Sequence, residues 1–148
     1  MSKPLDGLPL GAEREQAEAT QLYRLAAEQG VAGAQCRLGV MYADGRGVTQ
    51  DDTESVRWFR LAAEQGDAEA QAALGLAYAA GRGVAQDLVA SYSWLTMAAA
   101  QLTGATRNGA LKFRGSLEGA MTSEQITKAQ GLAQEWTPPS EHTETRRD

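Results

Sequence analysis

The feature that most constrains this chain is an internal repeat with a period of 36 residues. The letters LAAEQG occur at positions 25–30 and again at 61–66, and the residues around them repeat as well. Between segments 15–50 and 51–86, 20 of 36 positions are identical. A period of this length is typical of an array of helical or mixed units, in which each unit buries its apolar face against the next. The repeated unit therefore determines the fold.

Each unit has the pattern of two helices. In the first helix, residues at the spacing of one helical face recur one period later, namely Ala34, Leu38, Met41 and Tyr42, then Ala70, Leu74, Ala77 and Tyr78. We expect Gly45 and Gly81 to end these helices, because glycine adopts the left-handed terminal conformation without strain. Asp51, Asp67 and Asp87 are predicted N-caps. The chain is therefore predicted to be all-α, a stack of helix pairs that forms an α-solenoid.

The second helix of each unit carries an equally regular apolar face. Its members are Ser55, Trp58, Phe59, Ala62 and Ala63, then Ser91, Trp94, Leu95, Ala98 and Ala99, with an earlier, incomplete copy at Ala19, Leu22, Tyr23, Ala26 and Ala27. Gly39 and Gly75 lie inside the first helices, where glycine costs about 0.5–1 kcal/mol relative to alanine. We expect these glycines to let a bulky neighbour, Trp58 or Trp94, approach the helix backbone.

These letters resemble the Sel1-like repeat family, which is related to the tetratricopeptide repeats. The first full copy matches its pattern at Ala32, Ala34, Gln35, Leu38, Gly39, Tyr42, Gly45, Gly47, Val48, Gln50, Asp51, Trp58, Ala62, Ala63, Gln65 and Gly66. The next copy matches one period later, except that Leu102 replaces the final glycine. The resemblance implies a short right-handed α-solenoid of bacterial type with C-terminal capping helices. It also implies a concave surface for a protein or peptide.

The period and the resemblance divide the chain into segments. We predict a flexible segment at 1–12, a solenoid at 13–137 and a disordered tail at 138–148. The solenoid comprises a half unit at 13–30, full units at 31–66 and 67–102, and a divergent capping unit at 103–137. In the capping unit, extra residues at 103–108 are expected before the next helix, a capping box is expected at Thr122–Gln125, and Trp136 closes an apolar stripe.

The N-terminal half unit leaves two possibilities open. Its helix, expected at 13–29, matches a second helix whose first partner is missing. Either Leu5, Leu8 and Leu10 fold over it as an irregular cap, or its apolar surface meets another molecule, such as a second copy in a homodimer.

Composition excludes several classes of function. The net charge of −5 argues against nucleic acid, which attracts a basic surface. The only cysteine is Cys36 and the only histidine is His142, so no nucleophile–base pair or thiolate zinc site is predicted. We therefore predict a protein that is not an enzyme and needs no cofactor or metal. No apolar run resembles a leader or a membrane span, which predicts a cytoplasmic location, or a periplasmic one if a leader has been removed.

The resemblance implies a protein-interaction adaptor or regulator whose first helices line the concave face. The alternative is a dedicated inhibitor of one toxin or enzyme, of the immunity type. Carried over from the tetratricopeptide arrangement, the partner-binding positions are Cys36, Val40, Asp44, Glu69, Ala72, Leu76, Ala80 and Lys112. The partner would be an extended peptide or a helix with apolar anchors and a slightly basic character.

Overall fold

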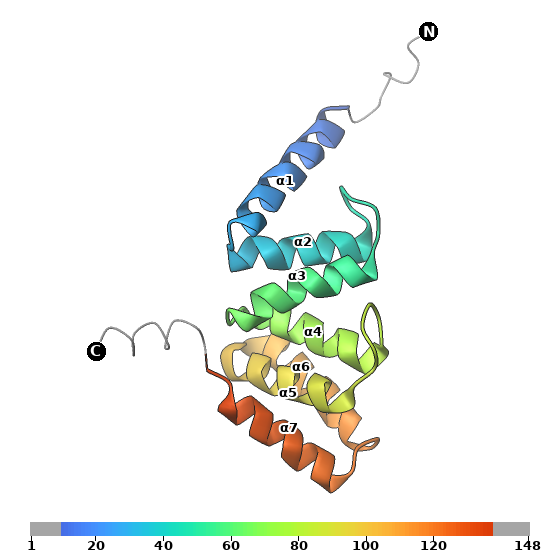
Figure 1. Cartoon of the computed structure of the whole chain (residues 1–148), viewed down its shortest axis with the longest axis vertical. Helices are drawn as coiled ribbons and strands as arrows, with labels where there is room; N and C mark the ends of the chain where they lie inside the picture. The colour runs from blue at the N-terminus through green and yellow to red at the C-terminus, as the bar shows by residue number, and fades with distance from the viewer. Residues whose placement is uncertain (1–9, 138–148) are drawn as a thin grey trace, which may run out of the picture.

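The chain forms a single stack of helix pairs in a computed structural model that describes residues 10–137 (Figure 1). The described part contains seven helices and no strand: α1 (Leu10–Glu28), α2 (Ala32–Asp44), α3 (Asp52–Glu64), α4 (Ala68–Ala80), α5 (Leu88–Gln101), α6 (Gly104–Glu118) and α7 (Ser123–Glu135). The predicted all-α solenoid is thus confirmed. Helix α1 begins three residues before the expected position 13, so residues 10–12 are helical rather than flexible. The predicted flexible residues 1–9 and the tail at 138–148 lie outside the described residues.

The helices are delimited by the residues that the sequence indicates. Gly45 and Gly81 end α2 and α4 in the left-handed conformation, with φ of 72° and 70°. The side chains of Asp51, Asp67 and Asp87 accept hydrogen bonds from the backbone N–H groups of the residues three positions later. Thr122 and Gln125 form the predicted capping box at the start of α7. These confirmed caps satisfy N–H groups that a helix start leaves without a partner.

The two interior glycines allow close packing within each helix pair, but the neighbours differ from those predicted. A Cβ atom on Gly39 would lie 2.7 Å from Cδ1 of Phe59, and one on Gly75 would lie 2.9 Å from Cγ of Leu95. The prediction of Trp58 and Trp94 was therefore wrong by one residue. Successive helix residues point about 100° apart, and Trp58 packs instead in the cluster of Ala27, Ala34, Leu38 and Met41.

The tyrosines and tryptophans of the repeat take up structural positions. Tyr42 and Tyr78 are half-buried, and their hydroxyls accept hydrogen bonds from Arg24 at 3.5 Å and Arg60 at 2.6 Å. Trp58 is buried, whereas Trp94 and Trp136 are half-buried. Trp94 packs against the cluster that includes Phe59, Ala63 and Leu74.

The 36-residue register continues into the third unit without an insertion. Helix α6 begins at Gly104, 36 residues after Ala68 begins α4. Of the expected extra residues, Thr103 is therefore the N-cap and 104–108 are part of the helix. The polar contacts confirm this register. Gln35 and Gln71 donate to the carbonyls of Ala27 and Ala63, eight residues earlier, and Arg107 donates in the same way to Ala99. The correction follows from these equivalent contacts, which hold α6 where α2 and α4 lie in their own units.

The last helix leaves the repeat pattern. In the first two pairs, α3 packs on α2 and α5 on α4, but α7 packs on α5, where the hydroxyl of Ser93 donates to the carbonyl of Ala129 at 3.0 Å. Leu111 stands in α6 at the position of Gly39 and Gly75. Gly131 of α7 stands in turn at the position of Phe59 and Leu95. The glycine and the bulky side chain of the first two pairs are therefore exchanged in the third unit.

Candidate functional site: a groove along the first helices

Three hollows lie along the first helices of the described residues, and we call them together the groove. The α1/α2 hollow has a volume of about 220 Å³, the α3/α4 hollow about 310 Å³ and the α4/α6 hollow about 450 Å³. The last two share Ala73, Leu76 and Phe113, so they adjoin one another. The groove thus crosses the faces of successive first helices.

The first two hollows are built from equivalent positions of the repeat. Ala19, Tyr23 and Val40 line the α1/α2 hollow, and their counterparts Ser55, Phe59 and Leu76 line the α3/α4 hollow. The difference between them lies in charge. Arg37 and Asp44 line the α1/α2 hollow where the α3/α4 hollow has Ala73 and Ala80. The groove therefore changes from charged at its N-terminal end to apolar over α4.

Helix α4 forms the apolar centre of the groove because its exposed face is almost free of charge. Leu76 is 45% exposed at the middle of this face, and alanines surround it. Glu69, in the first turn of α4, is the one acidic residue that lines the α4/α6 hollow. A carboxylate at this place also benefits from the positive end of the helix dipole.

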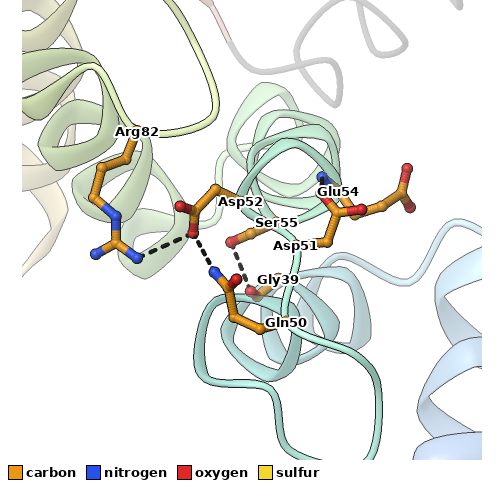
Figure 2. A network of polar contacts seen from close by, with 7 residues as sticks. All are labelled: Gly39, Gln50, Asp51, Asp52, Glu54, Ser55 and Arg82. Atoms are coloured by element: carbon orange, nitrogen blue, oxygen red, sulfur yellow. Dashed lines mark hydrogen bonds and ion pairs between the residues drawn. The ribbon is translucent and has the colours of Figure 1, made fainter.

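A polar network borders the α3/α4 hollow (Figure 2). The Arg82 guanidinium donates to Oδ1 of Asp52 at 3.0 Å, and the side-chain amide of Gln50 donates to the same oxygen at 2.7 Å. The Ser55 hydroxyl donates to the carbonyl of Gly39 at 2.7 Å, which fastens α3 to α2. Arg82 and Asp52 are both partly exposed, so this ion pair contributes little to stability but places charge at the edge of an apolar surface.

The structure brings most of the predicted groove residues together. Val40 and Asp44 line the α1/α2 hollow, while Leu76 and Ala80 line the α3/α4 hollow. Glu69 and Ala72 line the α4/α6 hollow with Leu76.

Two predicted residues are placed elsewhere. Cys36 is only 7% exposed and packs with Phe59, Ala70 and Leu74, so its side chain belongs to the core rather than to the groove surface. Lys112 stands at the position equivalent to Val40 and Leu76 and is exposed, but it lines none of the three hollows.

Sequence reasoning missed Phe113 and the contribution of α3. Phe113 lines both apolar hollows from α6, and Val56 and Phe59 line the α3/α4 hollow from a second helix. The predicted groove positions all came from first helices, so the residues of α3 were not among them. Phe113 follows the predicted residue Lys112 and stands at the position of Met41 and Ala77 in the repeat. An aromatic residue at this position was the signal in the sequence that could have indicated it.

The groove offers contact surface rather than reactive groups. Burial, helped by the nearby charges of Asp67 and Glu69, raises the pKa of the Cys36 thiol to about 12, so this thiol stays protonated. Among residues 10–137 no cluster of three or more histidine, cysteine, aspartate or glutamate side chains could hold a metal ion. Within the same range, no helix combines the length and the apolar character that crossing a membrane requires. What the groove can supply is apolar burial with charges at its borders.

Comparison with known proteins relates the chain to one family. The model of the Sel1 repeat matches three successive segments, residues 5–31, 32–67 and 68–101. Curated protein sequences yield no match.

Two solved structures are similar to this one. One is c5321, a protective antigen present in uropathogenic Escherichia coli strains that displays an SLR fold, with 33% identity, a TM-score of 0.77 and 84% of this chain covered. The other is a Sel1 repeat protein from Oxalobacter formigenes, with 36% identity, a TM-score of 0.62 and 68% of this chain covered. The matched part makes up only 26% of the first protein and 40% of the second.

Proposed function

The chain belongs to the Sel1 repeat family, and on this basis we propose that it is an adaptor that binds one protein partner in this groove. Sel1 repeat proteins generally mediate protein–protein interactions and are in general non-catalytic scaffolds. The observation that carries the proposal is the continuous apolar surface of the α3/α4 and α4/α6 hollows. Leu76 and Phe113, both exposed, belong to both hollows.

The shape and charge of the groove favour a particular kind of ligand. The alanines of α4 and Gly109 of α6 leave room for large side chains of a partner, since small residues line the walls. Burial of each such side chain contributes about 1.5–3 kcal/mol. Glu69 at one border favours a basic residue beside the apolar anchor. We therefore infer a helix or extended segment with two bulky apolar residues and a nearby lysine or arginine.

Binding through this surface can be tested with a single substitution and a matched control. Leu76→Lys places a charge between the two apolar hollows, whereas Leu61→Lys places the same charge on α3, outside all three hollows, at a leucine of similar exposure. Both variants should keep the helicity of the wild type by circular dichroism. Proteins captured from lysate of the producing cells by wild type and Leu61→Lys, but lost with Leu76→Lys, would support the groove.

The result also separates the two functions considered from the sequence. An adaptor predicts a groove-dependent partner that binds further proteins, and an immunity-type inhibitor predicts one partner whose own activity disappears on binding. A partner held equally by Leu76→Lys would exclude the apolar groove as the binding site.

A further inference from the structure

Helix α1 has one covered face and one open face. Thr20 and Ala27 are buried, with Ala27 packed beside Ala34 and Leu38 of α2. Leu22 is 66% exposed, and Tyr23, whose ring lies under the Arg37 guanidinium of α2, is 37% exposed. We define the open face as the apolar stripe of Ala19, Leu22, Tyr23 and Ala26. Its inner edge borders α2, and Leu22 at its outer edge has no described helix against it.

The repeat shows what this face contacts elsewhere in the same chain. One period later, Leu22 corresponds to Trp58 and Tyr23 to Phe59, and both of these are only 7% exposed. The difference arises because α3 pairs with α2, whereas no described helix precedes α1. Leu22 and Tyr23 are therefore exposed at positions that, in the next unit, pack against a first helix.

Both complete helix pairs show the same packing at this surface. The bulky side chain of the second helix lies against a glycine of the first, Phe59 on Gly39 and Leu95 on Gly75, at distances that leave no space for a Cβ atom. Tyr23 occupies the equivalent position on α1. A helix that covers this face in the same geometry must therefore carry glycine opposite Tyr23.

Among its described residues, a second copy of this chain offers no uncovered helix with glycine at the position of Gly39 and Gly75. Gly39 and Gly75 are already covered by α3 and α5. The third first helix, α6, has Leu111 in place of the glycine. Helix α6 of one copy therefore cannot pair with α1 of another in the repeat geometry.

We propose that the open face of α1 is a docking surface for the glycine-bearing first helix of another Sel1-like chain. The new contact would be continuous with an interface that already exists, since Trp58 of α3 packs beside Ala27 of α1 and Met41 of α2. Arg14 and Glu18 lie next to Leu22 along a shallow hollow of α1, so charges of both signs border the apolar centre. The docked helix would extend the array past its N-terminal end, while Leu111 and α7 close the other end.

The test uses a peptide with the sequence of residues 31–50 as the probe, since this segment contains α2 and its terminal Gly45. A hydrocarbon staple between positions 40 and 44, both exposed in α2, preforms the helix. A helix this short is otherwise marginal in water. We expect saturable binding to the full chain, with the largest amide NMR shifts at residues 19–26. The matched peptide with Gly39→Leu should bind at least about tenfold more weakly, since leucine at this position blocks the close approach.

Variants of the chain locate the site. Leu22→Glu should weaken binding at least about tenfold, because it puts a charge into the contact, and its exposed position leaves the fold intact. Leu132→Glu on α7 is the control, because Leu132 is also exposed. Leu76→Lys should not change binding either, which distinguishes this site from the apolar α3/α4 and α4/α6 hollows.

Several outcomes would overturn the proposal. Equal binding of the two peptides, shifts outside α1, or no binding of the helical probe would each do so. A chain that sediments as a dimer and becomes a monomer on Leu22→Glu would show that a second copy covers the face instead.

Discussion

Replacement of Gly39 by alanine tests the packing of the helix pairs most directly. Alanine is the better helix former, and its intrinsic propensity would stabilise α2 by about 0.8–1 kcal/mol. Against this, the new Cβ would lie 2.7 Å from Cδ1 and 2.8 Å from Cε1 of Phe59, a ring that is itself buried. Relief of such a contact requires a shift of the ring or of α3.

The magnitude follows from the two opposing effects. Overpacking of a close-packed core costs about 1–3 kcal/mol, and the gain in helix propensity offsets about 1 kcal/mol of it. We therefore expect a net loss of about 1 kcal/mol in the free energy of unfolding. Gly115→Ala in α6 is the control, since a Cβ there has no atom within 4 Å. This control should stabilise the protein by about 0.5–1 kcal/mol.

The assay is urea unfolding followed by circular dichroism at the helix minimum. A further comparison uses Phe59→Leu, because a smaller side chain relieves the contact. The double variant Gly39→Ala, Phe59→Leu should therefore lose less free energy of unfolding than the two single variants lose when their losses are added. The reasoning would be refuted if Gly39→Ala were as stable as Gly115→Ala, or if the double variant were merely additive.

Two more predictions concern the helix starts and the buried thiol. Asp67→Ala should lower the free energy of unfolding by about 1 kcal/mol, because the Asp67 carboxylate accepts a hydrogen bond from the N–H of Ala70. Val31→Asp should raise the free energy of unfolding, because Val31 caps α2 without a side-chain hydrogen bond. Equal and small effects of the two substitutions in urea unfolding would contradict this. Burial raises the pKa of Cys36 from 9.0 to about 12. Between pH 9 and pH 12 the unfolded chain therefore releases a proton from this thiol that the folded chain keeps. Because of this difference, the stability of the folded chain falls as the pH rises above 9. Cys36→Ala, which copies Ala72 of the next unit, should reduce the decrease in the free energy of unfolding between pH 8 and 10. An unchanged decrease would show that other groups cause it.

Much of the fold could be predicted because its determinants are local. The period revealed the helix pairs, and the caps at Asp51, Asp67 and Asp87 depend on contacts within one turn. The ends at Gly45 and Gly81 depend on backbone conformation alone. Groove positions such as Leu76 and Ala80 followed from helical spacing combined with the arrangement implied by the family.

Other features depend on how the helices dock, which local pattern does not determine. Whether Trp58 or Phe59 meets Gly39 is decided by the rotation of α3 about its axis, and one residue changes that direction by about 100°. The same docking buries Cys36 and turns Phe113 into the groove. Tertiary packing also places α7 on α5 rather than on α6, in the unit that has Leu111 where the first two have glycine. The sequence by itself thus determined the repeat, its helices and their ends, because these rest on contacts between near neighbours in the chain. The tertiary structure decided which side chains face the core, the groove or the open end, because packing fixes the orientation of each helix.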